Sequence, residues 1–98
     1  MTALVSEDQL AAFCRRWKVQ ELALFGSVLR SDFRPDSDVD VLVTFAPNAA
    51  WSVFDLVTMK EELEDLFGRP VDLVEQAGLR DPFRRHAILK HQKVLYAA

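Results

Sequence analysis

The chain has 98 residues, of which 50% are hydrophobic and 28% charged, a composition ordinary for a globular protein, and we expect one domain over residues 1–98. The formal net charge of −3 argues against a non-specific nucleic-acid binder, because such proteins displace counterions with a basic surface. The single cysteine, Cys14, excludes an internal disulfide and a zinc cluster built on cysteines.

In chain order, a first helix is predicted behind a cap at Ser6, because apolar residues then recur at helical spacing. A second helix is predicted to end at Gly68, a residue type common at C-terminal caps, and a third has Pro82 in its first turn. Short β-branched and apolar runs predict strands between them. The predicted helices cover residues 6–18, 51–67 and 79–91, and the predicted strands cover residues 21–25, 39–45, 71–74 and 94–96.

This order of elements predicts an α/β fold, with a small mixed sheet of three to four strands and helices packed mainly on one side. Cys14 lies in the first helical pattern and is predicted to be a small buried hydrophobe. Residues 18–20 are interpreted as a connection, and Glu75 as part of the turn after the third strand. The second helix carries acidic residues that are expected to form a solvated face: Glu61, Glu62, Glu64 and Asp65.

Two aspartates lie at the start of the second predicted strand. Side chains two apart on a strand share one face, so Asp38 and Asp40 should lie about 6–7 Å apart along it. Such carboxylates can converge on Mg²⁺, which prefers oxygen ligands and completes its shell with phosphates and water. Asp72, in the third predicted strand, would complete a triad if that strand lies beside the second. The alternative for Asp38 and Asp40 is a solvated turn without a metal ion.

Gly26 and Ser27 follow the first predicted strand. Gly26 allows the backbone to approach a phosphate, and Ser27 offers a hydroxyl and an amide at the start of a predicted helical turn, where N–H groups favour anions. Arg30 either contacts a phosphate or the acidic cluster, or forms a structural salt bridge with a nearby aspartate. A Walker-type phosphate loop is excluded, because the sequence has no GxxxxGK[ST] motif.

The spacing of these residues resembles the GSx10DxD signature of the polymerase β-type nucleotidyltransferase superfamily. The length of the chain and the loop LRSDFRPDS are similar to its minimal nucleotidyltransferase (MNT) branch, which often reads GSxARGEAxxxSDIDLLV. Leu29 and Ser31 depart from that pattern, where Ala and Gly are common, but neither departure removes a metal ligand. The matching positions are Gly26, Ser27, Arg30, Ser37, Asp38 and Asp40, with Asp32 where Glu is usual.

The resemblance covers most of the chain, because Asp72 and the C-terminal helix and strand also fall where the family has them. It implies transfer of AMP from Mg²⁺-bound ATP to an acceptor hydroxyl. Asp38 and Asp40 would hold the ions, two of them about 3.5–4 Å apart. Asp72 would be the third metal and catalytic residue and would orient or deprotonate the attacking hydroxyl. The nucleotide-binding residues would be Gly26, Ser27 and Arg30.

In the MNT branch the acceptor is a HEPN-domain toxin, a helical ribonuclease. The resemblance therefore implies an antitoxin that forms a hetero-oligomer with such a toxin and adds AMP to one of its tyrosines. The chain is too short for an acceptor-binding domain of its own, so we expect another chain to supply the acceptor. Because no apolar run has the length of a membrane span or the form of a signal peptide, we expect a cytoplasmic protein without membrane contact.

Two other functions stay open: a non-catalytic antitoxin that neutralises its partner by binding, and a nucleotidyltransferase that modifies a small molecule. The partner surface also has two candidates. Trp51 and Phe54 either anchor an interface or cover the sheet, and the basic helix around Arg84 and Arg85 either meets an acidic partner or a triphosphate, or is simply solvated. The two histidines, residues 86 and 91, are five positions apart, so no paired metal site is expected there.

Overall fold

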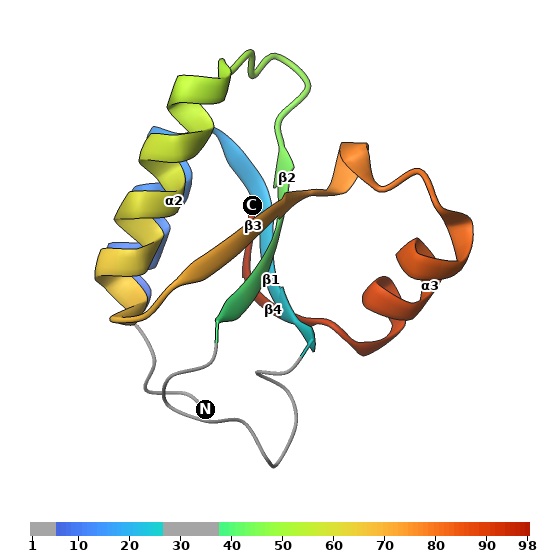
Figure 1. Ribbon diagram of the computed structural model, residues 1–98. Helices are drawn as coiled ribbons and strands as arrows, with labels where there is room; N and C mark the ends of the chain where they lie inside the picture. Colours follow the sequence, from blue (N-terminus) through green and yellow to red (C-terminus); the bar gives the residue numbers. More distant parts are fainter. Residues whose placement is uncertain (1–5, 27–37) are drawn as a thin grey trace.

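The computed structural model describes residues 6–26 and 38–98 (Figure 1). The helices in these two ranges are too short or too polar to cross a membrane. In chain order the elements are α1 (Glu7–Arg16), β1 (Val19–Phe25), β2 (Val39–Phe45), α2 (Val53–Phe67), β3 (Val71–Glu75), the short 3-10 helix η2 (Gln76–Gly78), α3 (Pro82–His91) and β4 (Lys93–Ala97).

The strands form one mixed sheet in the order β3-β2-β1-β4. β1 pairs antiparallel with both β2 and β4, whereas β2 and β3 run parallel and are connected through α2. β2 therefore has a neighbour on each side, in agreement with its apolar, β-branched sequence. The predicted α/β class and the mixed sheet are confirmed.

The helices cover the two faces of the sheet unequally (Figure 1). α1 and α2 pack on one face and form the larger core, in which Cys14, Met59 and Leu63 are fully buried. α3 packs on the other face, where Ile88 joins a smaller cluster with Phe25. Full burial of an aliphatic side chain contributes about 1.5–3 kcal/mol, so most of the apolar stabilisation lies on the α1–α2 face. The predicted packing of helices mainly on one side is confirmed.

Side chains of β2 alternate between these two clusters. Val39, Val41 and Val43 enter the larger core under α1 and α2. Leu42 belongs to the smaller cluster under α3. The even-numbered residues of β2 therefore face α3, and this alternation decides on which face the acidic residues at the start of β2 lie.

Two of the predicted turns are wrong. Residues 19 and 20 belong to β1, because Lys18 adopts a φ of 56° and reverses the chain within one residue. Val19 then pairs at once with the end of β2. Glu75 is the last residue of β3, where it pairs with Val43, and is not part of the exit turn. Val19 and Glu75 are strand residues because each pairs with a residue of β2 that is distant in the sequence.

The ends of α2 are set by local capping. The helix begins at Val53, two residues later than predicted, because Ser52 and Asp55 form a capping box. The Asp55 amide donates to Ser52 Oγ at 3.2 Å, and the Ser52 amide donates to Asp55 Oδ2 at 2.9 Å. At the other end Gly68 has a φ of 71°, which confirms the predicted C-terminal cap.

The acidic face predicted for α2 is not fully solvated. Glu62 is half-buried, and its Oε1 accepts a hydrogen bond from Trp17 Nε1 at 2.9 Å while its Oε2 lies 3.2 Å from Arg16 Nη1. Glu64 is also half-buried, and its Oε2 accepts from the Val71 amide at 3.0 Å. Glu62 therefore links α2 to the end of α1, and Glu64 links α2 to the start of β3.

Trp51 and Phe54 have different surroundings, so neither of the two alternatives holds for both. Trp51 packs edge-on against Trp17, with ring centroids 5.1 Å apart. Its Nε1 donates to the Trp17 carbonyl oxygen at 2.9 Å. Phe54, in contrast, is 84% exposed. Trp51 covers the core, and Phe54 stays on the surface.

The predicted burial of Cys14 is confirmed, and burial raises the pKa of its thiol from 9.0 to about 12. We expect the native protein to resist alkylation by iodoacetamide at about pH 8, because such a rise lowers the thiolate fraction about 1000-fold. In denaturant the thiol should react at the ordinary rate. Since the pKa of this thiol is higher in the folded protein, the contribution of the neutral thiol to the free energy of unfolding is complete below pH 9.0. It is lost as the pH rises toward about 12. Equal alkylation rates in the native and denatured protein would contradict this burial.

Candidate functional site

Asp38 and Asp40 lie at the start of β2, where the sequence places them. Asp38 directly precedes the strand and is exposed, and Asp40 is the second residue of the strand and half-buried. Val39 and Val41 point into the core under α1 and α2. Alternation therefore puts Asp38 and Asp40 on the opposite face of the sheet, on the side of Leu42 and α3.

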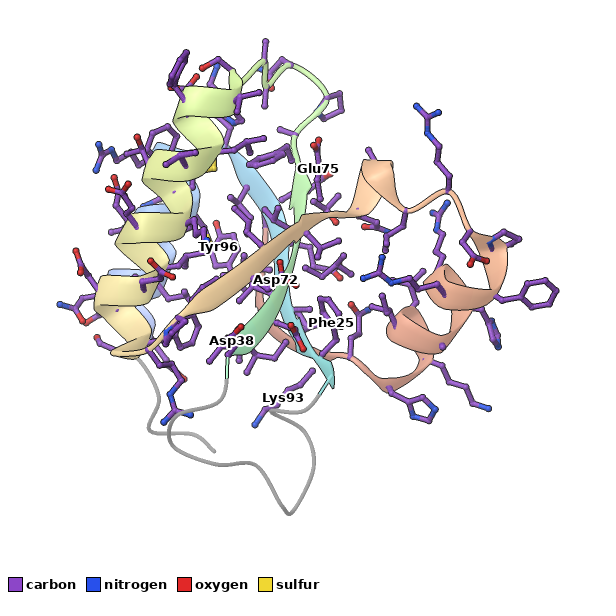
Figure 2. The ribbon with its side chains drawn as sticks, in the orientation of Figure 1. Phe25, Asp38, Asp72, Glu75, Lys93 and Tyr96 are labelled. Carbon is purple, nitrogen blue, oxygen red and sulfur yellow. The ribbon has the colours of Figure 1, made fainter. Side chains whose placement is uncertain are left out.

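Asp72 is the neighbour of Asp40 in the sheet. β2 and β3 run parallel, and Asp40 and Asp72 are direct partners in their register. Adjacent strands lie about 4.8 Å apart and partnered residues share a face, so both carboxylates leave the sheet on the same side. Figure 2 shows Asp38 and Asp72 on these two neighbouring strands. The third predicted strand therefore lies beside the second, which was the condition for Asp72 to join the other two aspartates.

Gly26 lies on the other side of Asp40. Phe25 pairs with Asp40 across the β1–β2 ladder, and Gly26 follows with a φ of 75°. A Cβ atom added to Gly26 would lie 2.2 Å from Asp40 Oδ2, far closer than Cβ atoms approach other groups. The Asp40 carboxylate therefore occupies space that any other residue at position 26 would fill. The sequence alone does not reveal this role of Gly26, because the role depends on the register between β1 and β2.

The donor set of this site consists of carboxylate oxygens. Asp40 and Asp72 are partners in register, and Asp38 precedes Asp40 by two residues on the same face. Mg²⁺ usually takes one or two carboxylates and fills its shell with phosphate and water oxygens, so the residues present fit this ion. In the part of the chain that the structure describes, no three acidic, histidine or cysteine side chains gather closely enough to enclose an ion by themselves.

Two predicted phosphate-binding residues, Ser27 and Arg30, lie outside the described residues. Lys93 was not singled out from the sequence. It begins β4 and pairs with Leu24, so it lies at the end of the sheet where β1 ends and β2 begins (Figure 2). This lysine brings a positive charge to the end of the sheet that carries Asp38. Only the pairing of β4 with β1 reveals its position, because residue 93 is distant from this loop in the sequence.

Comparisons with known proteins agree with the resemblance that the motif suggested. A family model described as a nucleotidyltransferase domain matches residues 7–95. The protein adenylyltransferase MntA of Thermococcus cleftensis is 40% identical over 65 residues, which are 66% of this chain and 64% of that protein. The sequence relationship therefore extends beyond the glycine and aspartate motif.

Solved structures share the fold. A proposed minimal nucleotidyltransferase is 34% identical, with a TM-score of 0.71 over 88% of this chain and 85% of that chain. A complex of a tri-AMPylated HEPN toxin with an MNT antitoxin from Shewanella oneidensis matches with a TM-score of 0.62 and 22% identity, over 94% of this chain and 70% of that chain. At this identity the second likeness shows the fold alone.

Substitution of each of the three glycines by alanine tests the contact between Gly26 and Asp40. We expect Gly26→Ala to lower the free energy of unfolding by about 1–2 kcal/mol through its positive φ, and further by displacing the carboxylate. Gly68→Ala has a φ of 71° but no atom within 4 Å of the added Cβ, so it should show only the first loss. Gly78→Ala, with no atom within 4 Å and no positive φ, is the control and should change stability little.

Urea unfolding of the three variants measures these differences. The expected order of destabilisation is Gly26→Ala, then Gly68→Ala, then Gly78→Ala. If Gly26→Ala were no more costly than Gly68→Ala, the carboxylate of Asp40 would not be held in place against Gly26.

Proposed function

This chain belongs to the nucleotidyltransferase domain family, and from that premise we propose that it transfers AMP from ATP to a hydroxyl of a HEPN-domain toxin, for which it is the antitoxin. The observation that carries the proposal is the register that sets Asp40 beside Asp72 and against Gly26. The protein adenylyltransferase of T. cleftensis supports a protein acceptor. The S. oneidensis complex, with an AMPylated HEPN toxin bound to an antitoxin of this fold, supports the kind of partner.

In the proposed reaction an oxygen of the acceptor attacks the α-phosphorus of ATP. A new bond joins this oxygen to AMP, the bond between the α-phosphorus and its bridging oxygen to the β-phosphate breaks, and pyrophosphate leaves. The proton of the acceptor hydroxyl passes to a base. We assign this role to Asp72, because it is exposed and lies on β3, the edge strand of the sheet, where an acceptor from another chain can reach it.

Asp38 and Asp40 are assigned to Mg²⁺, with two ions in the complete site. Ions bound there would neutralise charge on the phosphates and stabilise the attacking and leaving oxygens. Asp40 is suited to this task because β2 is paired along both edges, which fixes the direction of its carboxylate. Gly26, together with Ser27 and Arg30, is assigned to the triphosphate.

The acceptor is proposed to be a tyrosine of the toxin. A phenol has a pKa of about 10, well below that of the serine and threonine hydroxyls, so a carboxylate removes its proton more readily. Because β3 is exposed along its outer side, a side chain as long as tyrosine can extend from a bound partner to Asp72.

The transfer itself can be tested with ATP that is radiolabelled at the α-phosphate. In the presence of Mg²⁺, we expect the chain to label a co-expressed HEPN-domain protein far more than itself or bulk RNA. The Asp38→Asn, Asp40→Asn double variant should lose this labelling and keep its circular dichroism spectrum, since removing carboxylates that repel each other does not destabilise the fold.

Three outcomes would contradict the proposal in different ways. Undiminished labelling by the double variant would exclude the acidic site. Label that appears on RNA alone would exclude a protein acceptor. A stable complex with the HEPN-domain protein, without any label, would leave an antitoxin that acts by binding only.

Asp72 should affect the chemical step more than nucleotide binding. We expect Asp72→Asn to lower the transfer rate about 10²–10⁴-fold, the range for loss of a general base, and to change the affinity for ATP far less. Glu61→Gln, which neutralises an exposed acid on α2, is the matched control and should leave both unchanged. A variant that loses ATP binding but keeps its turnover at saturating ATP would contradict this division of roles.

A further inference from the structure

α3 leaves nearly all of its surface uncovered. Of its ten residues, Pro82–His91, only Ile88 is buried. The α1 helix has the same length but buries Leu10, Phe13 and Cys14. Phe83, in the first turn of α3, is 86% exposed. A surface helix normally turns a broad apolar stripe to the core, so a helix that packs through Ile88 and the half-buried Leu89, with a phenyl ring in solvent, has a second surface available for contacts.

The exposed residues form one defined face. Phe83, His86, Ala87 and Lys90 follow one another at intervals of three, four and seven from the first, so they lie on one side of the helix, and all four are exposed. We call these four residues the α3 outer face. Ile88 lies on the other side, against the sheet.

Positive charge is concentrated in the segment that contains α3. Five of the 12 Lys and Arg residues fall in residues 80–93, but only one of the 15 Asp and Glu residues, Asp81. Asp81 caps the helix, where its Oδ1 accepts from the amides of Phe83 and Arg84 at 3.0 and 3.5 Å. Across residues 6–26 and 38–98, no cation of α3 forms an ion pair with an acidic side chain. The segment is thus a basic patch on a chain whose net charge is −3.

We propose that the α3 outer face is the docking surface for the acceptor protein, and that it binds an acidic surface with an apolar pocket for Phe83. This inference rests on the proposed function, since the acceptor is the partner in question. The chemistry of this face favours an acidic protein partner, because Phe83 is an exposed aromatic anchor of the kind found in interface hot spots and Lys90 carries a positive charge on the same face. Arg80, Arg84 and Arg85 supply the charge that complements an acidic surface.

A nucleic acid fits this patch less well than an acidic protein. A polyanion gains its affinity from many phosphate contacts along an extended basic surface. Here five of the 12 basic residues are concentrated in residues 80–93, and the rest of the chain carries seven basic side chains against 14 acidic ones. A folded partner with a local acidic patch meets the positive charge alone, whereas a long polyanion would also meet the acidic remainder.

The position of α3 connects this surface to the candidate site. α3 packs on the face of the sheet that carries Asp38, Asp40 and Asp72, on the side opposite to α1 and α2 (Figure 2). A partner docked on α3 therefore lies on the same side of the sheet as the acidic site. Docking of this kind raises the local concentration of the acceptor hydroxyl and makes the attack on ATP effectively intramolecular.

The chain offers matched controls for a test. Phe83 and Phe54 both lie in the first turn of a helix, are 86% and 84% exposed, and belong to opposite faces of the sheet. Lys90 and Lys60 are likewise exposed lysines on α3 and α2. The test compares Phe83→Ala with its control Phe54→Ala, and Lys90→Glu with its control Lys60→Glu. The measurement is the Kd for the HEPN-domain protein by calorimetry, with the affinity for ATP measured in parallel.

We expect Phe83→Ala and Lys90→Glu each to raise the Kd about tenfold or more, as for hot-spot residues, and to leave ATP binding unchanged. The α2 controls should keep the Kd of the unmodified chain. Unchanged binding by both α3 variants would overturn the proposal, and a loss confined to Phe54→Ala would overturn it and move the docking surface to α2. Failure of the HEPN-domain protein to bind, or RNA binding that depends on Phe83 and Lys90, would overturn it as well.

The same experiment separates this inference from the proposed function. If AMP is transferred to the HEPN-domain protein while both α3 variants bind it normally, the docking surface is wrong and the activity stands. If both variants lose binding and no AMP is transferred by any form of the chain, the docking surface stands and the transferase activity is wrong.

Discussion

β2 is paired along both of its edges, antiparallel to β1 and parallel to β3, and this double pairing sets the position of Asp40. The odd-numbered residues of the strand enter the larger core, so Asp40 must face the other side. A carboxylate in the middle of that strand would lose its hydration at a high free-energy cost. At the second position it stays half-exposed, with Gly26 on one side and Asp72 on the other. The site follows from this register.

The larger core and the candidate site lie on opposite faces of the sheet. α1 and α2 enclose the larger core, and the hydrogen bonds of Glu62 and Glu64 fasten α2 to its neighbours. The opposite face holds a smaller cluster under α3, and it can therefore carry three aspartates and an exposed phenyl ring without loss of the main core. A protein of this size needs such a division, because small domains bury a small share of their surface.

Local sequence patterns predicted the elements whose ends depend on neighbouring residues. The bounds of β2 and the cap at Gly68 were predicted correctly, because alternation and a left-handed glycine are properties of a few adjacent residues. The errors have non-local causes. Val19 and Glu75 join strands because β2 offers them partners, and Glu62 is half-buried because Trp17 comes to meet it from another helix.

The sequence by itself determined the residues of the candidate site: two aspartates on one strand face, a glycine and serine before them, and a third aspartate in a later strand. These features depend on residue type and on the period of two along a strand, and both are local properties of the sequence. Only the tertiary structure decided that Asp72 partners Asp40, that Gly26 makes room for the Asp40 carboxylate, and that Phe83 stays in solvent. Strand order, register and burial arise from contacts between segments distant in the chain, and no local pattern encodes them.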